Sequence, residues 1–415
     1  MLKFNRDKGN CTGCAACYSA CPVHCITMNA DDEGFLYPDA SEACIECGLC
    51  EKVCPAVSHI GADASKRQEE GAGVSTRQEQ TADAPMHQKA FAAVSKDAGI
   101  WRRSASGGAF SEICRHWADA DTLIVGAAWD GLRVHHVGVK GFGGIAPLCK
   151  SKYVSSAIED TFVEIREALK AGRKAVFCGC PCQVAGLKAF LRKDYENLLT
   201  IDLICHGAGS PSVFEACMKS ISDFFGEEVK AYQFRAKRKH FEVDYLSRVE
   251  TKRGTHYVVK DPYIQLFLSQ NALRPSCGKN CKYRDPHRPG DITIADFKGL
   301  TDVFPDLTFQ KKNWSTIVCN TQKGERAVSQ LETTMEMRPC KLSDVIKHNP
   351  LFARQTFFSQ DRDAFFQDFK ADREKAIAKW TVPPTVFKPS LKKTVLNHLP
   401  TPLLQFASKM LHLMR

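Results

Sequence analysis

Short apolar runs recur from residue 88 onward, and their lengths predict strands rather than helices. Each run is five to seven residues long and is bounded by polar residues or turn formers. These runs predict strands at 122–128, 174–178, 198–204, 229–235, 291–296 and 315–319.

The segments between these runs show the spacing of amphipathic helices. Residues 158–171 carry apolar residues at helical intervals, namely Ile158, Phe162, Ile165 and Leu169. Helices are also predicted at 183–193, at 211–225 and, with a more charged surface, at 360–380. Residues 235–262 are largely polar, which favours an inserted antiparallel hairpin or loop. Strands that alternate with helices predict a body of the α/β or α+β class.

Composition divides the chain into four segments. Residues 1–57 form a cysteine-rich head, and residues 58–87 are dominated by small, polar and charged residues, which predicts a flexible linker. Residues 88–345 form the body, and residues 346–415 form a helical C-terminal extension. The basic tail ends in an amphipathic pattern, which favours docking on the core or a partner over contact with a membrane.

Charge is unevenly divided between the head and the rest of the chain. Residues 1–56 hold four Lys or Arg and eight Asp or Glu, a net charge of −4, which leaves +14 on the remainder. A basic remainder can indicate nucleic-acid binding, and it can equally attract the acidic head. Nucleic-acid binding is not expected, because the chain shows no zinc finger and no basic stripe interleaved with aromatic residues. The polar N-terminus has no apolar signal segment, so we expect a cytoplasmic protein.

Cysteine spacing carries the strongest chemical signal, since 20 of the 415 residues are cysteines. The strings CTGCAACYSACP and CIECGLCEKVCP both follow the pattern C-x2-C-x2-C-x3-C-P, which is typical of bacterial two-cluster ferredoxins. In this pattern three close thiolates hold one 4Fe–4S cluster and the fourth reaches the other cluster. A zinc site would need only two C-x2-C pairs and would not explain the two Cys-Pro endings.

The pattern assigns eight ligands to two clusters in the head. Cluster one takes Cys11, Cys14, Cys17 and Cys54, and cluster two takes Cys21, Cys44, Cys47 and Cys50. Gly13 and Gly48 keep side chains out of the tight ligand loops. Cys25 is a ninth cysteine in the head, and we interpret it as a small buried residue beside a cluster.

Six strings of the body together resemble the coenzyme F420 hydrogenase/dehydrogenase beta-subunit family. They are RRSASGGAFSEI, SKYVSSAI, FCGCPCQVAGLKAFL, IDLICHGAGSP, RPSCGKNCKY and GDITIADFKG, and they span about 88–335. The resemblance implies a flavoprotein domain with FAD and one further 4Fe–4S cluster, which makes three clusters in all. It also implies electron exchange with coenzyme F420, a deazaflavin.

The resemblance also implies particular site residues. The ligands of the body cluster would be Cys182, Cys205, Cys277 and Cys281, of which the first two follow predicted strands. The flavin contacts would be Ser104, Ser106, Gly107, Gly108, Lys152, Tyr153, Arg235, Lys237 and Asp296. His206 is a weak catalytic candidate, and a structural histidine is an equal alternative.

Three departures from the family pattern bear on these assignments. The last ligand pair is C-x3-C instead of C-x2-C, and Lys298 stands where the family usually has Trp. Cys178 and Cys180 are additional thiols beside Cys182, so one of them can replace a ligand of the body cluster.

Three functions remain open at this level. The first is an oxidoreductase that relays electrons between a deazaflavin and one-electron carriers through FAD and 4Fe–4S clusters. The second is a ferredoxin-dependent reductase of another small molecule, for example in polysaccharide or cofactor metabolism. The third is a non-catalytic electron-transfer subunit of a larger oxidoreductase complex. The partner is accordingly a redox protein, a small-molecule substrate or the rest of such a complex.

Overall fold

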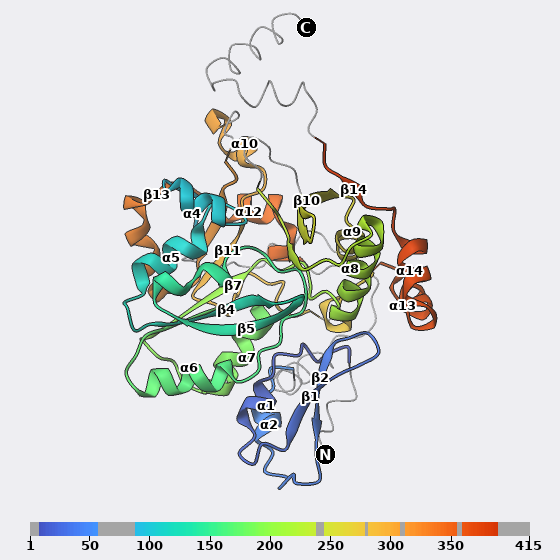
Figure 1. The fold of residues 1–415 in the computed structure, drawn as a ribbon. Coiled ribbons are helices and arrows are strands. Elements are labelled where there is room, and N and C mark those ends of the chain that lie inside the picture. Colours follow the sequence, from blue (N-terminus) through green and yellow to red (C-terminus); the bar gives the residue numbers. More distant parts are fainter. Residues whose placement is uncertain are drawn as a thin grey trace, which may run out of the picture.

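The structure is a computed structural model that describes residues 8–56, 88–237, 245–278, 281–307, 312–354 and 359–388. The predicted linker at 58–87 and the predicted amphipathic tail lie outside these residues. The described residues form a mixed α/β body with a small head at one end (Figure 1).

An eight-stranded mixed sheet forms the centre of the body. Its four inner strands, β11, β7, β6 and β4, run parallel, and antiparallel strands pair on both sides. The order across the sheet is β13 (Met335–Cys340), β3 (Lys89–Ser95), β12 (Ser315–Cys319), β11 (Ile292–Asp296), β7 (Leu198–Leu203), β6 (Ala175–Gly179), β4 (Leu123–Asp130) and β5 (Arg133–Lys140).

Helices cover both faces of this sheet. Successive side chains of a strand point to opposite faces, so neighbouring residues pack with different helices. On β4, Ile124 packs with the helices α5 (Ala109–Trp117) and α11 (Gln322–Ser329), whereas Val125 packs with α6 (Thr161–Lys170) and α7 (Pro181–Leu191). Both residues are 0% exposed. The inner strands therefore consist largely of apolar residues, as strands of a covered parallel sheet do.

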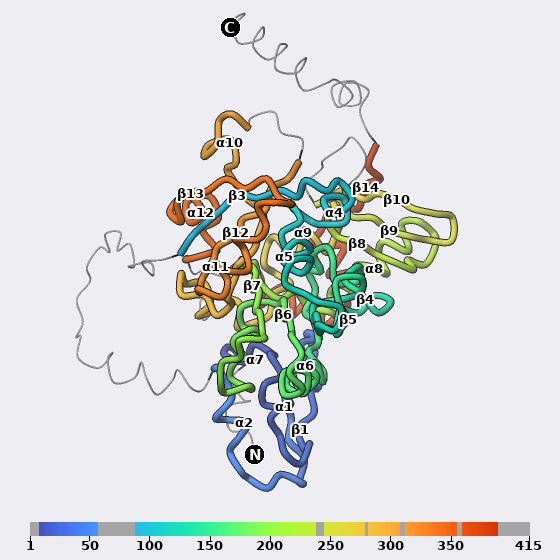
Figure 2. The backbone as a smooth tube through the Cα atoms, turned by 90° about the vertical axis from the view of Figure 1, so that its left-hand side faces the viewer, coloured from blue at the N-terminus to red at the C-terminus, as the bar shows by residue number. Residues whose placement is uncertain are grey.

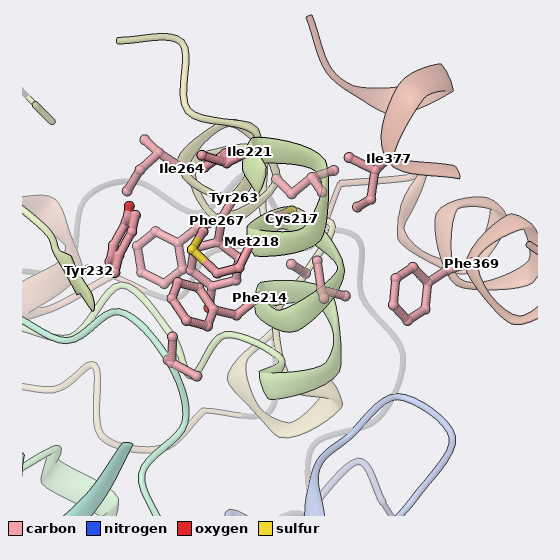
Figure 3. Packing of buried hydrophobic residues seen from close by; sticks show 14 of the residues in the cluster. Phe214, Cys217, Met218, Ile221, Tyr232, Tyr263, Ile264, Phe267, Phe369 and Ile377 are labelled. Carbon is pink, nitrogen blue, oxygen red and sulfur yellow. The ribbon is translucent and has the colours of Figure 1, made fainter. Parts of the chain in front are cut away.

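A second, four-stranded sheet packs beside the central one, in the order β14 (Thr385–Val386), β10 (Gly254–Val259), β9 (Ser247–Thr251) and β8 (Ala231–Gln233). Its apolar core gathers Phe214, Tyr232, Tyr263 and Phe267 around α8 (Pro211–Phe225) and α9 (Pro262–Leu268) (Figure 3). Helices α13 (Arg362–Ala371) and α14 (Arg373–Trp380) complete this part of the core. The other described helices are α4 (Ala98–Arg103), α10 (Leu300–Val303) and α12 (Leu342–His348).

The head consists of a hairpin and two short helices. Strands β1 (Ile26–Ala30) and β2 (Leu36–Ala40) pair antiparallel, and α1 (Ala16–Ala20) and α2 (Leu49–Lys52) lie next to them. Helix α1 contacts α7 and α6, so the head lies directly beneath these two helices (Figure 2). The head is therefore held against the body by direct packing.

Most of the predicted elements are present, with shifts at their ends. The predicted helix at 211–225 coincides with α8, and the predicted strand at 315–319 coincides with β12. The predicted strand at 229–235 is shorter, since β8 covers only Ala231–Gln233. Among the described residues, none of the helices combines the length and the apolar character that a membrane span requires.

Candidate cluster and cofactor sites

The two ligand loops of the head repeat the same backbone conformation 33 residues apart. Gly13 and Ala15 have positive φ angles of 69° and 59°, and the matching Glu46 and Gly48 have 51° and 68°. Left-handed residues on either side of the middle cysteine turn the chain sharply, so that three thiols converge. Two of these four positions carry residues that normally avoid this region, so the loop geometry overrides their local preference.

The predicted ligands of cluster one come together around a cavity. Cys11, Cys14, Cys17 and Cys54 line a space of about 120 Å³. Burial, together with the neighbouring Cys54 and Cys11, raises the pKa of the Cys14 thiol to about 11. Among the described residues, no three His, Cys, Asp or Glu side chains lie close enough to share one metal ion. The thiols enclose a volume instead, which fits the donor set of an iron–sulfur core.

Three of the four predicted ligands of cluster two pack together in one cluster of the head, which also contains Cys17. Cys21 is buried with Cys25, and both pack against Cys44 and Cys50. Cys47 is exposed, on the loop between β2 and α2. The hairpin turn contacts the body, where Glu33 forms an ion pair with Arg362.

The four predicted ligands of the body cluster also come together. Cys182 opens α7 after β6, and Cys205 follows β7 at the same edge of the sheet. Cys277 ends a short 3-10 turn, and the backbone N–H of Ala208 donates to its sulfur at 3.3 Å. Burial raises the pKa of Cys182 well above its ordinary value, and neighbouring Cys205, Cys277 and Cys281 raise it further.

A buried guanidinium supports the fit of an anionic group between these thiols. Arg284 is 6% exposed, and its Nη2 donates to the His206 carbonyl at 2.8 Å. Its Nε and Nη1 groups have no hydrogen-bond partner among the described residues. The hydrogen bond with Cys180, and after it the charge of Arg284, lowers the pKa of Cys205 to about 7. At Cys281 burial raises the pKa, and Arg284 opposes that rise. Unpaired buried donors are costly, so these N–H groups need an acceptor. An anionic iron–sulfur core held by four thiolates would supply one.

The first head site and the body site are neighbours across α7. A Cβ atom built on Gly186 would meet the Cβ and Sγ atoms of Cys14 at 2.8 and 2.9 Å, so only glycine permits this approach. Gly186 stands one helical turn after Cys182, on the same face of α7. Tyr283 also lies between the sites, since burial and then Cys182 and Cys14 raise its pKa.

Arg274 joins the head to the body, a role that the sequence pattern did not indicate. This side chain is 1% exposed and donates from Nε to the Cys11 carbonyl at 2.8 Å and from Nη2 to the Leu36 carbonyl at 2.9 Å. Its guanidinium lies 4.1 Å from the centre of the Tyr37 ring. A side chain on Gly13 would collide with it at 2.8 Å. The only sequence signal for this role was the presence of Arg274 at the start of the string RPSCGKNCKY.

The additional cysteines separate into two groups. Cys180 lies beside a predicted ligand, with its sulfur 3.7 Å from that of Cys205. Cys178 packs instead with the apolar side of the sheet, near Cys114 and Cys149. Cys180 is therefore within reach of the body site, whereas Cys178 points to the opposite face.

Several predicted flavin contacts take part in the packing of the body. Ser104 donates its hydroxyl to the Ile100 carbonyl, and Ser106 donates to the Trp314 carbonyl at 2.7 Å. A Cβ on Gly107 would meet the Ala93 carbonyl oxygen at 2.3 Å. Gly108 begins α5 with a φ of 102°. The small residues of this string thus permit the string to pack closely against β3 and β12.

The other predicted flavin contacts form a polar network beside that string. Lys237 donates to the carbonyls of Ser106 and Trp101 at 2.6 and 2.9 Å. Arg235 forms an ion pair with Asp296 and hydrogen-bonds Tyr153.

Lys152 and His206 bond to backbone carbonyls. Lys152 donates to the carbonyls of Pro147 and Cys149 at 2.9 and 2.8 Å, so its ammonium anchors the loop that precedes it. His206 Nε2 lies 3.0 Å from the Phe267 carbonyl oxygen, and burial lowers the pKa of this ring. This contact gives His206 a structural role in the described residues.

A cationic cleft next to this network was missed at the sequence level. It has a volume of about 340 Å³, and Arg103, Lys150 and Arg248 line it together with Trp129 and Tyr232. These residues are far apart in the chain and belong to no continuous motif, so only the fold brings them together.

The family models match both parts of the chain. Residues 10–58 match the 4Fe-4S dicluster domain, and residues 172–343 match the family described as the C terminus of the coenzyme F420 hydrogenase/dehydrogenase beta subunit. The fold and these matches define an iron–sulfur protein of the electron-transfer class. More narrowly, the match of residues 10–58 to a dicluster domain and of residues 172–343 to the coenzyme F420 hydrogenase/dehydrogenase beta-subunit family confirms the expected resemblance.

Two curated relatives resemble part of the chain. NADH-quinone oxidoreductase subunit I 2 of Geobacter metallireducens is 38% identical over 60 residues, which are 13% of this chain and 46% of the relative. A 7Fe ferredoxin of Hydrogenibacillus schlegelii is 46% identical over 41 residues, which are 10% of this chain and 47% of the relative. The chain thus spans about half the length of the curated relatives it matches.

One solved structure matches part of the chain. It comes from the F420-reducing NiFe hydrogenase complex of Methanosarcina barkeri, with a TM-score of 0.42 and 15% sequence identity. The match covers 70% of this chain and 89% of that one. A likeness at this level supports no conclusion about function.

Proposed function

We propose that this chain is an iron–sulfur flavoprotein oxidoreductase that exchanges electrons between a deazaflavin-type hydride carrier and one-electron carriers. The observation that carries the proposal is the contact between Cys14 and Gly186, one turn from Cys182. It brings a ligand loop of the head against the helix that bears a proposed ligand of the body. Electron transfer between two centres requires this kind of close approach.

Three sets of thiols would hold the clusters. Cys182, Cys205, Cys277 and Cys281 would hold the body cluster, and the two sets in the head would hold the others. Bound clusters supply one-electron chemistry, and bound FAD supplies hydride exchange. The chain itself excludes water with Tyr283 and places the charge of Arg284 beside the thiolates.

The proposed order of electron transfer among the three clusters follows from which ligand loop of the head packs against the body. Cluster one adjoins α7, whereas Cys47 of cluster two is exposed, on the loop between β2 and α2. We therefore propose the body cluster, cluster one and cluster two as the sequence of centres, with the redox partner docking near Cys47. That partner is a separate one-electron carrier or another subunit of an oxidoreductase complex.

The flavin would lie on the side of the body that holds the polar network. Arg235 and Lys237 supply positive charge for a diphosphate, and Tyr153 supplies an aromatic ring. The ion pair of Arg235 with Asp296 orients the guanidinium. This arrangement supports the flavin contacts expected from the family.

The test mixes anaerobically purified full-length protein with a chemically reduced viologen and oxidised deazaflavin. The proposal predicts loss of the deazaflavin absorbance in proportion to enzyme, and loss of this activity in Cys205→Ser. Protein that contains flavin and all clusters but leaves the deazaflavin unchanged would contradict the deazaflavin assignment. In that case, turnover with another small molecule identifies a different reductase, and co-purifying large subunits identify an electron-transfer subunit.

A further inference from the structure

The cationic cleft lies between β4, the loop at 146–150 and the second sheet. Trp129, from β4, and Tyr232, from β8, form its aromatic wall, with ring centres 6.1 Å apart. Trp129 is held in place by stacking on Phe234, with centres 5.9 Å apart. A volume of about 340 Å³ falls within the range of small-molecule sites.

The cleft has more positive than negative charge. Arg103, Lys150 and Arg248 contribute three cations, and Glu250 is the one carboxylate among the described lining residues. Glu250 pairs with Arg248 at 2.5 Å. Within the described residues, neither Arg103 nor Lys150 has a carboxylate within ion-pair distance. Asp97 attracts Arg103 from beyond ion-pair distance. Among the described residues these two cations therefore have no direct ion-pair partner, which leaves them able to bind phosphate or carboxylate groups.

The backbone presents Lys150 to the cleft at a conformational cost. Its φ is 71°, in the left-handed region that lysine seldom adopts. The loop around it is anchored, because Lys152 donates to two carbonyls and the Cys149 thiol donates to the Ile145 carbonyl. Burial and the nearby guanidinium groups of Arg235 and Arg248 lower the pKa of Lys150 to about 8. Strain of this kind is typical of ligand-binding positions.

We infer that this cleft binds the phosphate or carboxylate groups of an exchangeable small-molecule substrate. The aromatic wall favours a substrate that also carries a flat, apolar part. The cleft adjoins the proposed flavin contacts, because Arg103 directly precedes Ser104 and Lys150 lies near Arg235. The inference rests on the proposed function for the presence of a neighbouring flavin, while the anion site itself stands on the cleft.

The same anionic chemistry has two sources, the substrate and the diphosphate of the flavin. The experiment separates them by measuring anion binding and flavin content on the same samples. Isothermal titration calorimetry with inorganic pyrophosphate is carried out on the purified full chain, on Lys150→Gln, and on Lys150→Arg, which retains the charge. Lys140→Gln is the matched control, because Lys140 is an exposed lysine that pairs with Asp121 on the neighbouring surface.

We expect pyrophosphate to bind the unmodified chain and Lys140→Gln equally. Lys150→Gln should weaken binding by roughly tenfold or more, which is the loss of one charge-assisted hydrogen bond. Lys150→Arg should restore much of the affinity. Flavin content should be equal in all four proteins, because the substrate site is separate from the flavin.

Two results would overturn the inference. Equal pyrophosphate affinity in Lys150→Gln and the unmodified chain would remove the anion site. Loss of flavin from Lys150→Gln would show that the cleft holds the flavin diphosphate. A chain without any flavin that still binds pyrophosphate through Lys150 would refute the proposed function and leave the anion site intact.

Discussion

Cys21 and Cys25 lie with their sulfur atoms 3.4 Å apart, and Cys180 and Cys205 form a similar pair at 3.7 Å. In each pair one cysteine occupies a position expected of a cluster ligand and the other does not. In the first pair either sulfur can be the donor, so the Cys25 thiol is suited to donate an S–H hydrogen bond to the Cys21 sulfur. Hydrogen bonds to ligand sulfurs are one of the factors that set the potential of an iron–sulfur cluster.

Substitution distinguishes the ligand from the donor within the first pair. Cys25→Ala should retain the full iron content and make the potential of cluster two more negative, since one hydrogen bond to Cys21 is lost. Cys21→Ala should lose cluster two. Iron analysis and an EPR-monitored redox titration check both variants. Loss of iron from Cys25→Ala with retention in Cys21→Ala would reverse the assignment.

Protonation of Lys150 makes anion binding in the cleft depend on pH. The pKa of Lys150 is lowered to about 8 by burial and by Arg235 and Arg248, and only the nearby Cys149 opposes this. The ammonium is charged below that pH and loses its charge above it, so affinity should fall by roughly tenfold as the pH rises from 7 to 9. The ratio of pyrophosphate affinities between the unmodified chain and Lys150→Gln isolates this effect. A ratio independent of pH would contradict it.

Helix α7 combines two tasks that no other described helix shares. Its first turn carries Cys182, and one turn later Gly186 permits the contact with Cys14. The Gln183 side chain caps the start of α7 by accepting from the Cys180 backbone N–H at 2.9 Å. A single element therefore sets the spacing between the head site and the body site.

Gly186→Ala tests this role of α7. Alanine improves intrinsic helix propensity by about 1 kcal/mol, but its Cβ would collide with Cys14. Overpacking of this kind costs about 1–3 kcal/mol, so we expect a net loss of stability in chemical unfolding and slower reduction of the head clusters. Gly143→Ala is the control, since nothing lies within 4 Å of a Cβ there. Equal behaviour of both variants would refute the close contact.

The elements that were predictable from the sequence are those with a strong local signal. The buried strands and α8 have continuous apolar patterns or clear caps, and the head ligands follow a motif with fixed spacing. The roles of Gly186, Arg274 and Arg284 could not be predicted, because each depends on contact between segments far apart in the chain. The cleft around Lys150 was missed for the same reason.

At the scale of the whole molecule, the acidic head and the basic remainder meet through specific contacts. Glu33 pairs with Arg362, and Asp32 lies 3.7 Å from Lys370. The interface also includes the buried Arg274 and the packing of α1 on α7. The expected electrostatic attraction therefore operates within a packed interface.

Arg274→Met should weaken this interface. It leaves the carbonyls of Cys11 and Leu36 without their donors, at a cost of about 2–4 kcal/mol. The expected result is a lower denaturant midpoint and early loss of the head clusters. Visible absorbance of the clusters measures this loss. Arg253→Met is the control, because its side chain is 76% exposed and such surface pairs contribute about 0–1 kcal/mol. Equal midpoints would show that the interface does not depend on Arg274.

The central claim is that three iron–sulfur centres lie in one continuous series, with the body centre next to cluster one. Spin quantitation by EPR of the fully reduced, anaerobically purified chain tests it most directly. We expect three reduced 4Fe–4S clusters per chain, with a spectrum that shows magnetic interaction between neighbouring clusters. This spectrum should become simpler in Cys182→Ser. Two clusters per chain, with a spectrum unchanged in Cys182→Ser, would contradict it.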